Sequence, residues 1–173
     1  MKKLVLFSVT LLAILFIGGA CATTMRPTAT ATLSPSSGQT ASGTVTFTEQ
    51  ADGSVQVSVN LTGVPPGIHG FHVHENGDCG NNGGAAGGHF NPASTPHGGP
   101  NAPEHHAGDF GNVEADASGN VKETKSLHGI TVSAGANSVV GRAVILHEKP
   151  DDLTTQPTGN AGSRIACGVV QLK

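Results

Sequence analysis

Short runs that alternate between apolar and polar residues constrain the fold of this chain more than any other feature. The clearest run, 54–61, reads S-V-Q-V-S-V-N-L, which places three valines and a leucine on one face of an extended strand. A turn at Ala51-Asp52-Gly53 precedes it, and no segment keeps a helical period over three turns. Further short strands are predicted at 43–47, 71–74, 139–146, 165–172 and from Val121 onward, of which 139–146 and 165–172 are apolar enough to be well buried. The pattern predicts an all-β domain.

Two long stretches interrupt the strand pattern. Residues 75–111 are rich in Gly, Asn, Pro and His, and residues 148–163 are polar and contain Gly159 and Gly162. Long irregular loops are uncommon in compact domains unless they carry function. Short strands with two such loops predict a β-sandwich or barrel whose chemistry lies on the loops. We find no internal repeat and no second domain in the sequence.

The N-terminus has the layout of a secretory signal peptide. Lys2 and Lys3 precede an almost wholly apolar run over 4–17, and small residues follow it. The alternative is an uncleaved membrane anchor, but a spanning helix needs about 20 apolar residues and this run is shorter. We therefore predict a signal peptide over 1–20, a tether over 21–28 and one domain over 29–173.

Cys21 follows two small residues, as the lipid-accepting cysteine does in the lipobox of bacterial lipoproteins. That pattern prefers a branched apolar residue three positions earlier, where this chain has Gly18. The competing interpretation is ordinary cleavage at Ala20-Cys21-Ala22. We favour lipidation of Cys21. It predicts export from a bacterial cytoplasm and a membrane-anchored domain at the periplasmic or extracellular face.

Charge and cysteine content fit an exported protein that does not bind nucleic acid. Without Lys2 and Lys3, seven basic side chains face twelve acidic ones, a formal net charge of −5. No basic stripe is present for nucleic acid. Apart from Cys21, two cysteines remain, Cys79 and Cys167. In an exported protein this even number favours one disulfide over two buried free thiols.

Histidines concentrate in the middle of the chain, where seven of the nine lie between positions 69 and 106. His72 and His74 stand two positions apart in a predicted strand, so both imidazoles share one face and could meet one metal ion. Phe71 and Val73 would then pack into the core. An H-x-H pair alone is weak evidence, because alternating polar residues are common in strands.

The 75–111 loop adds further metal donors. Three histidines and one carboxylate match the four-coordinate set that zinc prefers: His89, His97, His106 and Asp109. Flanking Gly and Pro residues fix unusual backbone angles, which holds ligands rigidly without a helix. His147 arrives from a later strand.

Together these motifs resemble the copper/zinc superoxide dismutase family. The matching segments are G-F-H-V-H-E-N-G-D at 70–78, G-H-F-N-P at 88–92, H-G-G-P at 97–100, H-A-G-D-F-G-N-V at 106–113, G-R-A-V-I-L-H-E-K-P-D-D-L at 141–153 and G-N-A-G-S-R-I-A-C-G at 159–168. They occur in the family's order, and the resemblance covers residues 29–173. It implies a Greek-key β-sandwich or flattened barrel of about eight antiparallel strands with two long functional loops.

The resemblance implies a role for each site residue. The implied copper ligands are His72, His74, His89 and His147. The implied zinc ligands are His97, His106, Asp109 and again His89, which bridges the two metal ions. Asp151 is implied to hydrogen-bond one ligand of each metal, His72 and His97. Arg164 is implied to hold the anionic substrate beside the copper, and Cys79 and Cys167 to form the family disulfide.

The activity implied by the resemblance is disproportionation of superoxide to dioxygen and hydrogen peroxide by redox cycling of a copper ion, with a zinc ion that orders the loop. A rival is a copper- and zinc-binding envelope protein without turnover, but such a protein is expected to lose a copper ligand or the arginine. A second rival, a structural envelope module, leaves the histidine spacing unexplained. A homodimer remains open, because the 148–163 loop is shorter than in eukaryotic members and lacks several of their charged residues.

Three histidines receive a structural interpretation. We expect His69 to be packed in the fold, His105 to point away from the zinc site and His128 to lie in an exposed turn.

Overall fold

A computed structural model describes residues 25–173, so the predicted signal peptide and the predicted lipidation site at Cys21 lie outside the described residues. The eight strands are β1 (Thr28–Pro35), β2 (Ser42–Glu49), β3 (Val55–Thr62), β4 (Gly67–His74), β5 (Asp109–Ala115), β6 (Val121–Leu127), β7 (Ala143–His147) and β8 (Arg164–Leu172). The one helical element within 25–173 is a single 3₁₀ turn, η1 (Gly84–Ala86). The prediction of an all-β fold with about eight antiparallel strands is confirmed.

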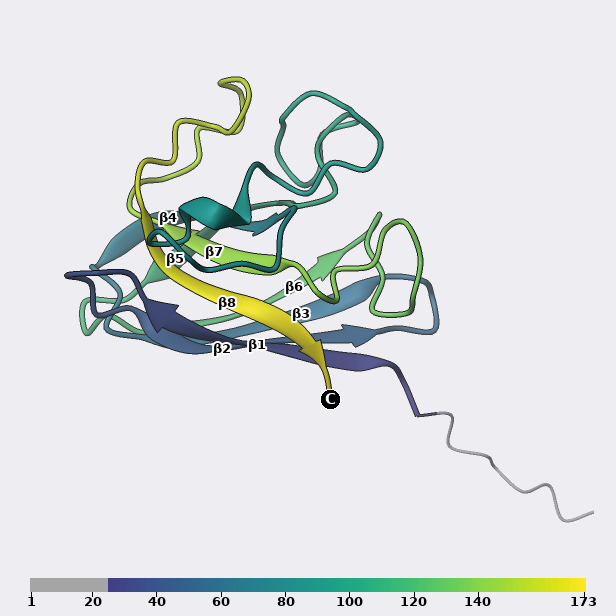
Figure 1. Ribbon diagram of the computed structural model, residues 1–173, viewed down its shortest axis with the longest axis horizontal. Coiled ribbons are helices and arrows are strands. Elements are labelled where there is room, and N and C mark those ends of the chain that lie inside the picture. The colour runs from purple at the N-terminus through teal and green to yellow at the C-terminus, as the bar shows by residue number, and fades with distance from the viewer. Residues whose placement is uncertain (1–24) are drawn as a thin grey trace, which may run out of the picture.

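The strands form one antiparallel sheet in the order β5-β4-β7-β8-β1-β2-β3-β6, and this sheet curls into a nearly closed barrel (Figure 1). The edge strands β5 and β6 are joined by side chains. Lys125 Nζ donates to the Asn112 carbonyl at 2.6 Å, and the Glu114 amide donates to Glu123 Oε1 at 2.7 Å. Around the barrel β4, β5 and β6 lie in chain order, and β3, which precedes β4 in the chain, lies on the other side of β6. This is a Greek-key arrangement.

Apolar side chains fill the barrel interior. Burial alternates along β3 as the sequence predicts, with the inward positions Val55, Val57, Val59 and Leu61. The Phe110 ring lies between those of Phe47 and Phe71, at centroid distances of 6.3 and 6.0 Å. Phe71 and Val73 of β4 belong to this core. The alternate residues of β4 therefore face away from the apolar core, toward the functional loops.

Some element boundaries differ from the sequence prediction. Thr28, assigned to the tether, is already the first residue of β1. β5 begins at Asp109, inside the stretch predicted as loop, and β7 begins only at Ala143. Residues around Gly141 form a turn, in which Gly141 adopts a φ of +79°. No helix within residues 25–173 is long and apolar enough to cross a membrane.

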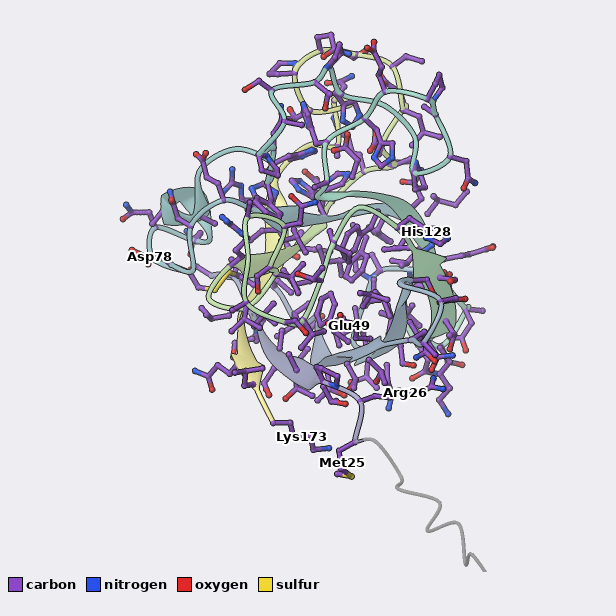
Figure 2. The ribbon with its side chains drawn as sticks, turned by 90° about the vertical axis from the view of Figure 1, so that its right-hand side faces the viewer. Met25, Arg26, Glu49, Asp78, His128 and Lys173 are labelled. Atoms are coloured by element: carbon purple, nitrogen blue, oxygen red, sulfur yellow. A yellow bond between two sulfur atoms is a disulfide. The ribbon has the colours of Figure 1, made fainter. Side chains whose placement is uncertain are left out.

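The two long loops lie on the same side of the barrel (Figure 1). Met25 and Lys173 lie close together at the opposite end (Figure 2). The Lys173 amide donates to the Thr28 carbonyl at 3.0 Å, which ties the last strand to the first. The barrel therefore presents its loops away from the point where the described chain begins.

Candidate metal centre

Seven buried side chains form two adjoining clusters at the base of the long loops. The all-histidine cluster consists of His72, His74, His89 and His147. The mixed cluster consists of His89, His97, His106 and Asp109. In each cluster the candidate donor atoms lie within 4.8 Å of one another, and His89 belongs to both. The structure thus brings together every residue that the sequence predicts as a metal ligand.

Strand pairing positions the all-histidine cluster. His72 and His74 lie on β4, which pairs with β7, and β7 ends at His147. His89 comes from the loop and forms an isolated antiparallel bridge with His74. Beside it, the Phe90 amide donates to the Val73 carbonyl at 2.8 Å. The loop segment that carries His89 is therefore held to β4 by backbone hydrogen bonds.

One nitrogen of each of three rings in this cluster has a hydrogen-bond acceptor. The pairs are His72 Nε2 with Asp151 Oδ2 (2.8 Å), His74 Nδ1 with the Gly87 carbonyl (2.9 Å), and His147 Nδ1 with the Gly162 carbonyl (3.2 Å). A neutral imidazole carries one proton, which these acceptors assign to the nitrogen that faces them. The other nitrogen of each ring is therefore left with a lone pair.

Buried ring nitrogens that lack a hydrogen-bond partner indicate whether metal ions fit the two clusters. Within residues 25–173, His72 Nδ1, His89 Nε2 and His97 Nδ1 are buried and have no such partner. His74 Nε2 and His147 Nε2, both unprotonated by the argument above, lie 3.3 Å apart. Facing lone pairs repel each other, and a cation between them removes the repulsion. The all-imidazole set suits copper, and three imidazoles with a carboxylate suit zinc.

Asp109 lies at the centre of the mixed cluster. Its carboxylate oxygens lie 2.7 Å from His89 Nδ1, 3.1 Å from His97 Nδ1 and 3.2 Å from His106 Nδ1. The amides of His106 and Gly98 donate to Oδ2 at 2.8 and 3.1 Å. Burial opposes ionisation, but the hydrogen bonds from His89 and the two amides outweigh it and hold the pKa of Asp109 well below its usual value. Asp109 is therefore an anion at neutral pH.

Burial keeps the surrounding imidazoles neutral. It lowers the pKa of His74 to about 2 and that of His147 to about 4. The pKa values of His72 and His106 are also lowered, again chiefly by burial. Metal ligands must be unprotonated. These rings are therefore in the form that binds a cation at neutral pH.

Asp151 joins the two clusters. Its Oδ2 accepts from His72 Nε2 at 2.8 Å and its Oδ1 from His97 Nε2 at 3.0 Å. The Asn112 side-chain amide fixes the Asp151 backbone, because it accepts from the Asp151 amide at 2.7 Å and donates to the Asp151 carbonyl at 2.9 Å. One carboxylate thus orients a ring of each cluster. Sequence reasoning assigns no role to Asn112, although Asn112 lies within a quoted motif.

Arg164 is the cation beside the all-histidine cluster. Its Nη2 donates to the Gly87 carbonyl at 2.6 Å, and its Nη1 donates to the Gly83 carbonyl. The Gly87 carbonyl also accepts from His74 Nδ1. One backbone oxygen therefore fixes both the half-buried guanidinium and a ring of the cluster.

Cys79 and Cys167 form a disulfide with a Cα–Cα distance of 5.7 Å, as predicted. It ties the start of the histidine-rich loop to β8. The Gly83 amide donates to the Cys79 carbonyl at 3.1 Å. The disulfide therefore supports the turn whose Gly83 carbonyl accepts from Arg164.

The other three histidines lie outside both clusters. His69 is buried, and its ring nitrogens lie 2.8 and 2.7 Å from the carbonyls of His147 and Pro65. His105 Nδ1 lies 2.8 Å from the His106 carbonyl, and His128 is exposed.

Comparison with known proteins identifies the family. A family model described as copper/zinc superoxide dismutase matches residues 41–170, well over half of the chain. The chain belongs to this family. Among solved structures, one titled as the crystal structure of the clock protein EA4 is similar, with 43% sequence identity and a TM-score of 0.79. The match covers 87% of this chain and 97% of that chain.

In this member of the copper/zinc superoxide dismutase family, Gly159 leaves the space that the Asp151–His97 hydrogen bond needs. A Cβ at Gly159 would lie 2.5 Å from Asp151 Cγ, 2.6 Å from His97 Nε2 and closer still to Asp151 Oδ1. We expect Gly159→Ala to displace the carboxylate and to lower zinc affinity by about 10-fold, in the range typical for a lost partner of a metal ligand. Competition with a coloured zinc chelator measures this affinity.

Gly129→Ala is the matched control, because it separates the clash from backbone strain. Gly129 has a φ of +79°, close to the +68° of Gly159, but nothing lies within 4 Å of its added Cβ. Both variants carry the cost of a left-handed alanine, about 1–2 kcal/mol. Equal zinc affinities in the two variants would show that Gly159 has no steric role at the site.

Proposed function

We propose that this protein disproportionates superoxide to dioxygen and hydrogen peroxide as a copper- and zinc-dependent enzyme. The observation that carries the proposal is the sharing of His89 between two complete four-donor clusters. Family membership supports it. So does the position of Arg164, because Arg164 and His74 share the Gly87 carbonyl.

The residues present would hold both metal ions. His72, His74, His89 and His147 would hold copper, and His89, His97, His106 and Asp109 would hold zinc. When bound, copper supplies one-electron transfer to and from superoxide, whereas zinc is redox-silent and orders the loop.

The chain's own residues bind the anion and move a proton. Superoxide is a small anion, and the guanidinium of Arg164 offers it a positive charge near the all-histidine cluster. Formation of hydrogen peroxide consumes two protons. His89 is suited to hold one of them at Nε2, because this atom has no partner within 25–173 while Nδ1 stays 2.7 Å from Asp109. Asp109 and Asp151 keep the rings oriented throughout.

A second candidate is a copper- and zinc-binding protein of the cell envelope without turnover. The similar solved structure is named for a clock protein rather than for an enzyme. Fold and ligand set alone do not distinguish binding from catalysis.

A dismutation assay on the purified protein, with copper and zinc measured on the same sample, distinguishes the two candidates. We expect dismutation from protein that holds both metals and none from metal-free protein. Full loading with both metals and no dismutation would favour the second candidate.

We further propose that the domain is exported and anchored to a membrane through lipid on Cys21, and that two copies can associate as a homodimer. The signal-peptide layout supports export, and so does the disulfide, because disulfides persist in oxidising compartments. Intact mass measurement of the exported protein separates a lipidated Cys21 from a chain cleaved beyond it.

A further inference from the structure

Gln156, in the 148–163 loop, contacts the backbone of His97 in the mixed cluster. The His97 amide donates to Gln156 Oε1 at 2.8 Å, and Gln156 Nε2 donates to the His97 carbonyl at 2.8 Å. A single side-chain amide therefore pairs with both polar groups of one residue's backbone. Gln156 falls between the two motifs that flank this loop, so the family resemblance assigns it no role.

These two hydrogen bonds are the ones that fix the His97 backbone. His97 is buried and lies in irregular chain, outside any helix or strand. Within residues 25–173, neither its amide nor its carbonyl has another hydrogen-bond partner. A buried backbone group that loses its partner is costly, so removing the Gln156 amide is expected to destabilise this position of the His97 backbone.

The His97 ring is fixed at the same time from another direction. Its Nε2 donates to Asp151 Oδ1 at 3.0 Å. This hydrogen bond sets the orientation of the ring but not the position of its Cα. Gln156 supplies a constraint at the His97 backbone itself.

The turn that carries Gln156 is folded by its own hydrogen bonds. Asp152 Oδ1 accepts from the amides of Thr154 and Thr155 at 3.0 and 2.7 Å, and Asp152 Oδ2 accepts from Thr155 Oγ1 at 2.6 Å. The Asp152 amide donates to the Gly159 carbonyl at 2.9 Å. A pre-folded turn reduces the conformational entropy that is lost when Gln156 binds His97.

We propose that Gln156 is a positioning residue for the zinc ligand His97, and that it slows the release of zinc. The proposal rests on the function proposed above, because it requires the mixed cluster to hold zinc. Loss of a hydrogen-bonding partner of a metal ligand typically lowers metal affinity by roughly 10–100-fold. For two neutral hydrogen bonds to backbone we expect the lower end of that range.

The test compares zinc release from the purified holoprotein of three variants with that of the wild type. Gln156→Leu keeps the size of the side chain but removes both hydrogen bonds, and Gln156→Asn keeps the amide but shortens its reach. Thr158→Val is the matched control in the same turn, because within 25–173 the Thr158 hydroxyl has no hydrogen-bond partner. Transfer of zinc to a coloured chelator gives the release rate. The visible spectrum of cobalt bound in place of zinc reports the ligand geometry independently of activity.

We expect both Gln156 variants to release zinc about 10-fold faster than the wild type and to shift the cobalt bands, while Thr158→Val matches the wild type. Wild-type release from both Gln156 variants, or equal acceleration by Thr158→Val, would overturn the role of Gln156. A wild-type protein that takes up neither zinc nor cobalt would instead overturn the proposed metal centre, and this inference with it.

Discussion

Replacing Arg164 by glutamate is expected to lower the superoxide dismutation rate about 100-fold at low ionic strength, while copper and zinc contents stay near wild type. The chain without Lys2 and Lys3 has a formal net charge of −5, so the overall field repels an anionic substrate. Attraction must therefore be local, and Arg164 is the cation held beside the all-histidine cluster by the Gly87 carbonyl. Local positive potential in a cleft raises association rates by roughly 10–10³-fold.

The salt dependence and two milder substitutions identify the cause. Added salt should slow the wild-type enzyme but should not slow Arg164→Gln, because screening removes an attraction that this variant lacks and leaves only a repulsion to be weakened. Arg164→Lys should retain part of the rate, because it keeps the charge but loses the planar fork that donates to two carbonyls. Wild-type activity in Arg164→Glu would show that another group guides the substrate. Loss of metal in that variant would show that Arg164 acts through the fold.

Removing the disulfide is expected to have the largest effect on stability. Cys79 and Cys167 are 88 positions apart, and the chain-entropy model gives about 4–5 kcal/mol for a loop of that length. In a Cys79→Ala/Cys167→Ala double variant we expect the Tm to fall by about 10–15 °C. The melting experiment uses metal-free protein, so that metal binding does not add to the stability.

The double variant should also lose activity after metal is restored, because the Gly83 carbonyl that accepts from Arg164 depends on the turn that begins at Cys79. Wild-type protein with its disulfide reduced is the control for lost side-chain volume, and it should melt close to the double variant. A Tm within about 3 °C of the oxidised wild type would contradict the stabilising role.

Strands with a strong period-two pattern could be predicted from the sequence, and strands built from small or chemically active residues could not. The alternation over 54–61 carries large side chains, and β3 occupies nearly that span. β1 buries mainly Ala29, Ala31 and Leu33, so its apolar signal is weak. β5 begins with the candidate metal ligand Asp109 and contains Gly111, so its sequence resembles that of the preceding loop.

The site residues also divide into those that the sequence predicts and those that it does not. Histidine, aspartate, arginine and cysteine carry their chemistry in the side chain, so their roles follow from the short motifs that carry the family resemblance. Asn112 and Gln156 act through amides that bond to backbone. An amide of this kind has no sequence signature, because its partner depends on how two loops approach each other. The role of Gly159 likewise depends on how the two loops approach each other, because its missing side chain leaves room for Asp151 and His97.

The most direct test of the proposed activity is a copper titration of the zinc-loaded protein, with bound copper and superoxide dismutation rate measured at each step. Within residues 25–173 there is one all-histidine cluster. We therefore expect the rate to rise in proportion to bound copper and to level off at one copper per chain. Copper binding that saturates at one per chain without any dismutation would contradict the proposed function and leave a metal-binding protein.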